Sequence, residues 1–399
     1  MGEVRIEKLV YGGAGLGRQE GQVVLVPFVL PGEEVRAETT RDRGDLLEAR
    51  ATEILEPAPE RIVPACEYYA RCGGCHYQHA GYEFELAQKA GILKETLARV
   101  GRVMPPENID VAAGPEWGYR NRSQFHLRDG GIGYLEPASH TFVAVERCPI
   151  SSPRLNEAVA ALREMAGDER FPGFLRTIEL FTNEDQVQIN VLDTAGGRRV
   201  GRHFFEWCEE RIAGAASGAI DYAAQRETYR DGYRSFFQVN RFLIDKMVDA
   251  ALAGAEGEWA LELYAGVGLF SLPLARRFRR VTAVESGTSA WRDLGFNAER
   301  AGLVIEAMRA PADLFLETVD SRPDFVLADP PRAGLGKGVV PELLRLRPPK
   351  LAIVSCDPAT LARDVSALLA GGYQVDSMTL VDLFPRTYHI ESVSHLSLA

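Results

Sequence analysis

Apolar and polar positions follow different periods along the chain, and the first region shows the two-residue period of β-strands. Between residues 1 and 56, runs such as 4–10 and 49–56 alternate, and glycines separate the runs as turns do. This pattern predicts about five short strands, which would close into a small β-barrel of the OB type. A β-module without any binding role would show the same pattern, so both interpretations stay open.

A proline-rich linker follows residue 56, and the pattern beyond it is mixed. Residues 83–100 repeat apolar positions at helical spacing, whereas runs such as 123–127 alternate like strands. A second helical stretch near 153–166 interrupts these strands. We therefore predict a central α+β domain over residues 57–235.

In the last region, short apolar runs alternate with helical stretches. The runs have the length and composition of buried strands and lie at 259–264, 281–284, 325–328 and 351–354. Alternation of strands and helices predicts a parallel, doubly wound sheet. Residues 236–399 are therefore expected to form a C-terminal α/β domain of Rossmann-like type.

Composition and charge exclude several classes of protein. The 399 residues are 46% hydrophobic and 25% charged, which argues against a disordered chain, a collagen and a coiled coil. No apolar run reaches the ~18 residues of a membrane span. The charged start of the chain lacks the apolar core of a signal peptide, so we expect a cytoplasmic protein. A net charge of −11 argues against nonspecific coating of nucleic acid.

Candidate ligand-binding residues lie where the first two strands of the last region end. The strand at 259–264 runs into a Gly-x-Gly turn at Gly266 and Gly268, and Glu285 ends the next strand. Small residues let a ligand approach the backbone, and a carboxylate at that position can accept both hydroxyls of a ribose. This combination is common in S-adenosylmethionine (SAM) methyltransferases, although Gly-x-Gly alone also occurs in simple strand–helix turns.

Later strands end in groups with reactive chemistry. Asp329 begins an Asp-Pro-Pro sequence that would hold its carboxylate at the sheet edge. Cys356 follows the next strand, although a lone cysteine there is more often a small buried hydrophobe. Glu391 lies two positions after His389, so both would face one side of an extended segment. Such a segment alone is more often a solvated loop, but next to a cysteine nucleophile it would supply a base.

Three cysteines crowd into ten positions of the central region, which in a reducing compartment indicates a metal site. The asymmetric spacing and a distant fourth thiol favour a [4Fe–4S] cluster, whereas neighbouring histidines keep a zinc site open. The candidate ligands are Cys66, Cys72, Cys75 and Cys148, with His76 and His79 as the alternative ligands for zinc.

These motifs, in this order and together with Ser235-Phe236-Phe237-Gln238-Val239-Asn240, make the chain resemble the RNA 5-methyluridine methyltransferases. In that family a TRAM domain, a [4Fe–4S] domain and a SAM methyltransferase domain follow one another. The resemblance implies methyl transfer from SAM to carbon-5 of a specific uridine in structured rRNA or tRNA, through a covalent Cys–uracil intermediate.

The resemblance also assigns roles to residues. It implies Cys356 as the nucleophile and Glu391 as the general base. It implies that the cofactor and the base are bound by Gln238, Tyr264, Gly266, Glu285 and Asp329, that Asp313 contacts the adenine, and that Cys66, Cys72, Cys75 and Cys148 hold the cluster. Tyr119-Arg120-Asn121-Arg122 is similar to a family segment that faces the RNA.

Two other functions stay open. One is a SAM methyltransferase that acts on an amino nitrogen of a nucleobase, but Arg332 stands where such enzymes carry a stacking aromatic. The other is a noncatalytic Fe–S RNA-binding protein, against which the intact pair of Cys356 and Glu391 argues. We expect a monomer whose partner is RNA and not a membrane.

Overall fold

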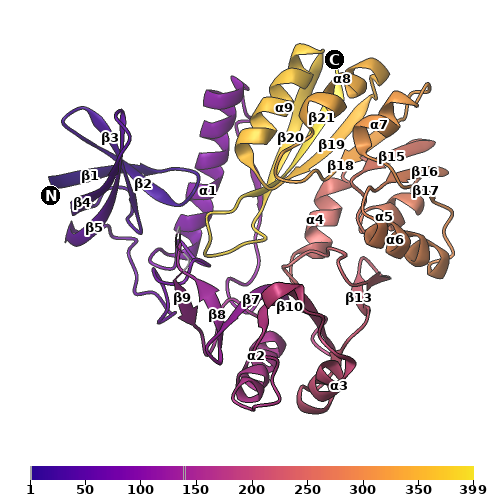
Figure 1. The fold of residues 1–399 in the computed structure, drawn as a ribbon. Coiled ribbons are helices and arrows are strands. Elements are labelled where there is room, and N and C mark those ends of the chain that lie inside the picture. Colours follow the sequence, from indigo (N-terminus) through magenta and orange to yellow (C-terminus); the bar gives the residue numbers. More distant parts are fainter. Residues whose placement is uncertain (1, 138, 140) are drawn as a thin grey trace.

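The first part of the molecule is a closed five-stranded barrel, as the alternation in residues 1–56 predicts. The computed structural model describes residues 2–137, 139 and 141–399 and shows the barrel at one side (Figure 1). Alternate residues of its strands, among them Val4, Ile6 and Val24, are buried in its core. The strand order β1-β2-β3-β5-β4 joins β1 (Gly2–Leu9), β2 (Ala14–Gln19), β3 (Gln22–Pro27), β4 (Glu34–Asp42) and β5 (Leu46–Glu56).

A long helix leads from the cysteine segment back towards the C-terminal part of the molecule. Helix α1 (Tyr82–Thr96) continues as a π-helical turn, η1 (Leu97–Gly101), and both contact α9 (Pro358–Ala370). Strand β6 (Asp110–Ala112) then pairs in parallel with β20 (Tyr373–Val381). These segments therefore pack on the C-terminal sheet, although the predicted division assigns them to the central domain.

The central part is a six-stranded sheet with two helices packed on it (Figure 1). Its core includes Phe125, Leu155 and Ile178, all almost fully buried. The strand order β12-β11-β10-β7-β8-β9 joins β7 (Arg122–Arg128), β8 (Gly131–Leu135), β9 (Phe142–Ala144), β10 (Leu175–Thr182), β11 (Val187–Thr194) and β12 (Ala215–Ala216). The helices are α2 (Pro153–Ala166) and α3 (Arg202–Arg211), with a 3₁₀ turn, η2 (Ala195–Gly197), between them; a separate hairpin follows, β13 (Ile220–Ala224) and β14 (Glu227–Asp231).

The C-terminal part confirms the predicted α/β architecture. Its eight-stranded sheet has the order β17-β16-β15-β18-β19-β21-β20-β6. The strands are β15 (Trp259–Leu263), β16 (Arg280–Val284), β17 (Glu306–Met308), β18 (Phe325–Ala328), β19 (Lys350–Ser355), β20 and β21 (Glu391–Leu398). The helices are α4 (Ile244–Ala251), α5 (Ser271–Ala275), α6 (Thr288–Arg300), α7 (Ala312–Glu317), α8 (Gly336–Leu346) and α9.

One strand departs from the parallel arrangement, and this departure shapes the site. The five strands from β17 to β19 are parallel, so their carboxyl ends meet at one edge. Strand β21 runs antiparallel to β19, with Ser355 opposite Ser392. The first residue of β21, Glu391, therefore lies at the same edge as the residue after β19, Cys356. Among the described residues, every helix is too short or too polar to span a bilayer.

Candidate active site

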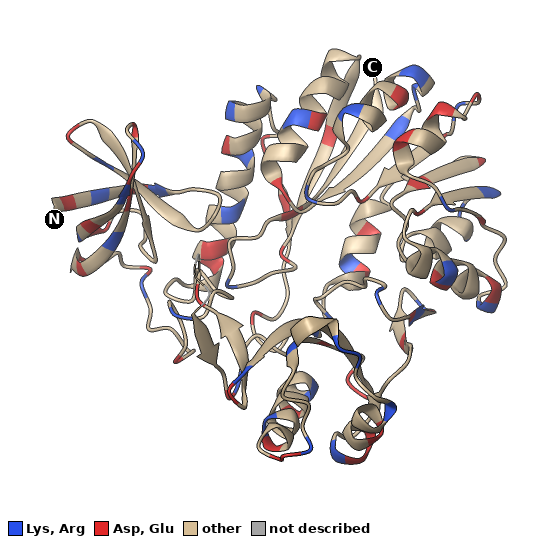
Figure 2. Ribbon diagram, in the orientation of Figure 1, with Lys and Arg blue, Asp and Glu red and all other residues tan. Residues whose placement is uncertain are grey.

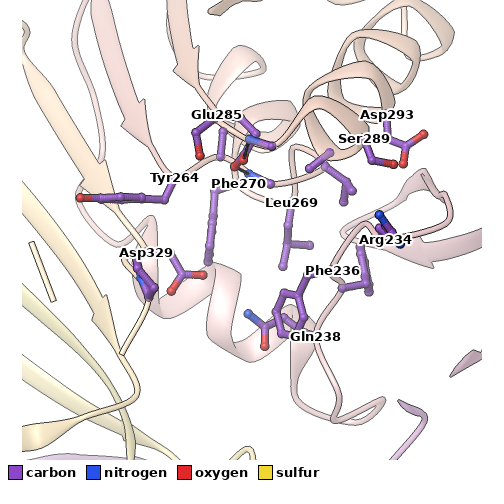
Figure 3. A pocket seen from close by; sticks show the side chains of 18 of the residues that line it. Arg234, Phe236, Gln238, Tyr264, Leu269, Phe270, Glu285, Ser289, Asp293 and Asp329 are labelled. Carbon is purple, nitrogen blue, oxygen red and sulfur yellow. Dashed lines mark hydrogen bonds between the residues drawn. The ribbon is translucent and has the colours of Figure 1, made fainter. Parts of the chain in front are cut away.

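A cavity of about 1530 Å³ opens where the parallel strands end. Figure 3 shows residues from the turns after β15, β16 and β18 on one side of this cavity and Phe236 and Gln238 facing them. Of the eight residues that the resemblance assigns to catalysis or cofactor binding, seven line it, namely Gln238, Tyr264, Gly266, Glu285, Asp329, Cys356 and Glu391. Asp313 instead lines a neighbouring cavity of about 350 Å³, which shares Tyr264 with the first.

The turn after β15 forms one half of the cavity, which we call the cofactor half (Tyr264, Gly266 and Glu285). Tyr264, Gly266 and Gly268 all have positive φ angles, of 63°, 56° and 95°. A Cβ on Gly268 would lie 2.6 Å from Leu294, so the close approach of α6 requires glycine there. Glu285 accepts hydrogen bonds from the backbone N–H of Gly266 (2.9 Å) and of Gly287. Its carboxylate thus joins the ends of β15 and β16 and faces the cavity.

The other half, which we call the reacting half, brings together Cys356, Glu391 and Asp329. Burial, together with the charges of Glu391 and Asp329, raises the pKa of the Cys356 thiol to about 11, and the charge of Arg332 partly opposes this. Glu391 is buried, and its burial together with Asp329 holds its pKa well above the usual range. Burial likewise raises the pKa of Asp329 to about 7. All three groups therefore hold protons more tightly here than in water.

Two features of the reacting half favour the thiolate. Cys356 directly precedes Asp357, which caps the N-terminus of α9 by accepting from the backbone N–H of Ala359 (3.0 Å) and Thr360 (2.9 Å). A helix N-terminus stabilises an adjacent negative charge. The second feature is the positive charge of Arg332 beside the thiol.

His389 is placed as an acceptor and not as a base. The guanidinium of Arg332 lies 2.7 Å from His389 Nδ1 and can only donate. Burial, followed by the charge of Arg332, lowers the pKa of His389 to about 3. The ring is therefore neutral at physiological pH. It holds Arg332 in place between the Asp-Pro-Pro turn and the segment before β21.

Most of the segment that was expected to face RNA lies inside the molecule, so this expectation is wrong for Tyr119, Asn121 and Arg122. Tyr119 and Asn121 are fully buried. Arg122 forms ion pairs with Glu179 (2.7 Å) and Asp231 (3.2 Å) and donates to the backbone carbonyl of Ser235 (2.7 Å). Sequence alone could not show this, because the acids that neutralise Arg122 come from other strands.

The role of Arg122 is to support the segment that carries an exposed aromatic ring. Phe236 follows Ser235, is 59% exposed and lines the cavity. The guanidinium carbon of Arg122 lies 5.8 Å from the centre of this ring. Three further arginines that the sequence analysis did not single out line the same opening, namely Arg230, Arg234 and Arg292.

The four cysteines of the predicted cluster lie near one another. The charge of Cys148 raises the pKa of Cys66, Cys72 and Cys75 beyond the effect of burial, and the pKa of Cys72 reaches about 11. Within the described part of the chain, however, no three Cys, His, Asp or Glu side chains are arranged to hold a metal ion. His79 is buried and His76 is half-buried, and burial lowers the pKa of both to about 4, so both rings are neutral.

A half-buried arginine, Arg120, lies beside these thiols and bears on which group they could bind. The Nε atom of Arg120 is buried without a hydrogen-bond partner. The negative charges that interact with this guanidinium include those of Cys148 and Cys75. A cluster held by four thiolates is negatively charged and would satisfy this orphaned donor. The charge of Arg120 therefore matches a thiolate-held cluster, whereas the described positions of Cys66, Cys72, Cys75 and Cys148 do not by themselves form a metal site.

Known proteins that are similar to the whole chain are RNA methyltransferases. Residues 216–398 match the model of the tRNA (uracil-5-)-methyltransferase family, and residues 2–52 match the TRAM domain. A 23S rRNA (uracil(1939)-C(5))-methyltransferase of Alkalilimnicola ehrlichii is 33% identical, and the match covers 98% of this chain and 95% of that protein. An uncharacterized RNA methyltransferase of Aquifex aeolicus is 31% identical, with 99% and 98% covered.

A solved structure extends this similarity to the fold. The tRNA (uracil-54, C5)-methyltransferase of Pyrococcus abyssi, in complex with S-adenosyl-L-homocysteine, superposes with a TM-score of 0.77 at 26% identity. The match covers 98% of this chain and 99% of that one. The barrel, the central sheet and the C-terminal domain are thus all included in the comparison.

Proposed function

We propose a covalent mechanism from the premise that the chain belongs to the RNA (uracil-5-)-methyltransferase family and is a SAM-dependent enzyme of that class. In this proposal Cys356 attacks the target uridine and Glu391 removes the proton that the methyl group replaces. The observation that carries it is the position of both side chains in one cavity with the glycine turn and Glu285. A methyltransferase acting on an amino nitrogen would need neither group.

The need for a nucleophile follows from the chemistry of uracil. Carbon-5 of the ring is a poor nucleophile, but addition of the Cys356 thiolate to carbon-6 turns the ring into an enolate that is nucleophilic at carbon-5. SAM, when bound, supplies an electrophilic methyl group. Glu391 then takes the proton from carbon-5, the bond between sulfur and carbon-6 breaks, and the thiolate is restored. Asp329 is positioned to hydrogen-bond the polar edge of the uracil.

The elevated pKa of Glu391 suits the role of a base. A carboxylate in a buried site binds a proton more tightly than one in water, so its ionised form is a stronger base. The same burial disfavours the thiolate of Cys356, and Arg332 and the N-terminus of α9 oppose that effect. Cys356 must therefore lose its proton before the first bond forms, and Glu391 must be ionised when the carbon-5 proton is removed.

The cofactor half fits SAM. Glu285 has a free lone pair on each carboxylate oxygen after accepting from Gly266 and Gly287, so it can accept the ribose hydroxyls. Gly266 itself carries no side chain, which leaves room beside the backbone for the methionine part. Gln238 and Tyr264 line the space between this turn and Asp329, and Asp313 is proposed to accept from the adenine amino group in the adjoining cavity.

Structured RNA is the proposed substrate. A uridine inside a helix cannot reach Cys356, so it must leave its stack, and the exposed ring of Phe236 can replace the lost stacking. Arg230, Arg234 and Arg292 can contact phosphates around the opening. Ribosomal RNA is the first substrate to test, because the relatives that act on 23S rRNA share about a third of the residues over the full chain. Transfer RNA is the second.

We also propose that Cys66, Cys72, Cys75 and Cys148 hold a [4Fe–4S] cluster. The cluster would tie the loop at 66–75 to the distant Cys148; the methyl transfer itself requires no electron transfer. Cys148→Ser should lower the iron and sulfide content of anaerobically purified protein and its thermal midpoint. Cys208→Ala, which removes a buried thiol from another core, is the matched control and should retain iron. Stoichiometric zinc without iron would contradict the proposal.

The covalent mechanism is tested with Glu391→Gln. Glutamine keeps the shape but cannot take the carbon-5 proton, so addition and methyl transfer should proceed and elimination should stall. We expect a protein–RNA adduct on a denaturing gel that carries the radiolabelled methyl group. The double variant with Cys356→Ser is the control and should give no adduct. Normal turnover of Glu391→Gln would overturn the assignment, and so would an inactive variant that binds RNA with wild-type affinity but forms no adduct.

A further inference from the structure

Behind the reacting half, three distant parts of the chain meet around one side chain, Tyr388. Its ring lies 5.7 Å from that of Tyr11 in the barrel, edge to face, and 4.6 Å from that of His76 in the cysteine segment. The adjacent His389 ring lies 4.4 Å away. Tyr388 belongs to the segment 382–390, which connects β20 to Glu391. The barrel therefore contributes a side chain to the packing behind the reacting half.

Tyr11 also contacts the segment of the proposed nucleophile. It lies in the tight turn between β1 and β2, which is closed by hydrogen bonds from the N–H of Gly13 to Val10 (3.1 Å) and from that of Val10 to Ala14 (2.9 Å). Its hydroxyl donates to the backbone carbonyl of Cys356 at 3.3 Å. Burial raises the pKa of Tyr11, so the hydroxyl keeps its proton and can donate.

The turn that carries Tyr11 is itself seated against the cysteine segment. A Cβ on Gly13 would lie 3.1 Å from the Cβ of His76, so the two segments are in close contact. The backbone N–H groups of His76 and Tyr77 both donate to the carbonyl of Arg386, at 2.7 and 3.0 Å. Barrel, cysteine segment and segment 382–390 thus hold one another in place. Figure 1 shows the β1–β2 turn directed from the barrel towards the yellow C-terminal segment.

The charges on the barrel are mixed in sign, which does not favour strong electrostatic binding of RNA. Acidic and basic residues alternate along its strands (Figure 2). Several of its arginines are engaged by acids of the same barrel, in the pairs Arg5–Glu56 (2.7 Å), Arg43–Glu48 (2.7 Å) and Arg50–Glu38 (3.2 Å). The contact that the barrel makes with the site is made through Tyr11.

We propose that Tyr11 is a positioning residue of the methyl-transfer site, through which the N-terminal barrel holds Cys356 and the segment of Tyr388 in reacting geometry. The proposal rests on the proposed role of Cys356 as nucleophile. The hydroxyl restrains the backbone of Cys356. The ring packs against Tyr388 and so stabilises the segment that leads to Glu391. Displacement of reacting groups by small distances lowers the rate without weakening substrate binding.

The test compares Tyr11→Phe and Tyr11→Ala in the full-length protein. Phenylalanine keeps the ring and removes only the hydroxyl, whereas alanine removes both contacts. Tyr373→Phe is the matched control, because its hydroxyl also donates to a backbone carbonyl, that of Pro348 (2.8 Å), and it does not line the cavity. Single-turnover methyl transfer is measured at saturating RNA and SAM, together with the Kd for RNA.

We expect the single-turnover rate to fall about two- to tenfold in Tyr11→Phe, as the loss of one hydrogen bond allows, and further in Tyr11→Ala. The Kd for RNA should stay within about twofold, and Tyr373→Phe should behave as wild type. Unchanged rates in both Tyr11 variants would overturn the proposal. An increased Kd with an unchanged rate at saturation would also overturn it, because Tyr11 would then be an RNA contact.

A readout without RNA separates this proposal from the mechanism on which it rests. The rate at which iodoacetamide alkylates Cys356, followed on its peptide by mass spectrometry, should rise in Tyr11→Ala because the thiol loses its restraint. An unchanged alkylation rate would contradict the positioning role. Methyl transfer by Cys356→Ala would instead overturn the nucleophile assignment, while the alkylation result would still report on Tyr11.

Discussion

The two halves of the cavity are built in different ways. The cofactor half comes from consecutive strand ends, and Glu285 closes it by binding the backbone N–H of Gly266. The reacting half is assembled from the ends of β18 and β19 and the start of an antiparallel strand, and Tyr11 of a separate barrel donates to the backbone behind it. A local motif is enough to form a cofactor site, whereas a covalent site requires several distant segments to be held in register. The two halves should therefore respond differently to substitution.

Cys356→Ala is expected to give the largest difference between the responses of the two halves. Loss of the thiol should reduce methyl transfer to background, because no other group can activate carbon-5. The Kd for SAM should be unchanged, since the cofactor half does not need the thiol. Radiolabelled methyl transfer and SAM titration measure the two quantities. Turnover above about a tenth of wild type would remove Cys356 from the nucleophile role, because loss of a covalent catalyst costs far more than that.

The second largest difference is expected in the pH dependence of the two halves, measured as the methyl-transfer rate and as SAM binding. Cys356 and Glu391 act without their protons, and both pKa values are raised, that of Cys356 to about 11. The reactive fraction therefore increases with pH, and the single-turnover rate should rise by up to about tenfold per pH unit between roughly pH 6 and 9. Binding of SAM should change little over the same range. A rate that is flat or falls with pH would contradict the protonation states proposed here.

Glu285→Ala is expected to disturb the cofactor half alone. The variant loses the acceptor for the ribose hydroxyls, so the Kd for SAM should rise about 10- to 100-fold, as hydrogen bonds to a charged group would require. Alkylation of Cys356 should proceed at the wild-type rate. Calorimetric titration with SAM checks the first statement. Wild-type affinity would mean that the ribose lies elsewhere.

The smallest effect is expected from Asp313→Ala, which tests how far the cofactor half extends. Asp313 lines the neighbouring cavity beside Tyr264, so loss of one contact to the adenine amino group should raise the Kd for SAM about two- to tenfold. Asp320→Ala, which removes an exposed acid in the same region, is the control and should have no effect. Equal affinities of the two variants would exclude Asp313 from the adenine site.

The sequence by itself determined the parts of this protein that depend on local patterns. Alternation predicted the barrel, and apolar runs between helices predicted the strands whose carboxyl ends hold Gly266, Glu285 and Asp329. These predictions succeed because hydrophobic period and turn residues act over a few neighbouring positions. The residues of the reacting half could be listed from their motifs, although the motifs carried no information on how they meet.

Only the tertiary structure decided how distant segments combine. It placed β6 and α1 on the C-terminal sheet, turned β21 antiparallel so that Glu391 reaches Cys356, and brought Tyr11 against the backbone of Cys356. It also buried the Tyr119–Arg122 segment, because Glu179 and Asp231 neutralise Arg122 from other strands. Strand pairing and ion pairing join residues tens to hundreds of positions apart. No local period records such partners, so these features follow from packing of the whole chain.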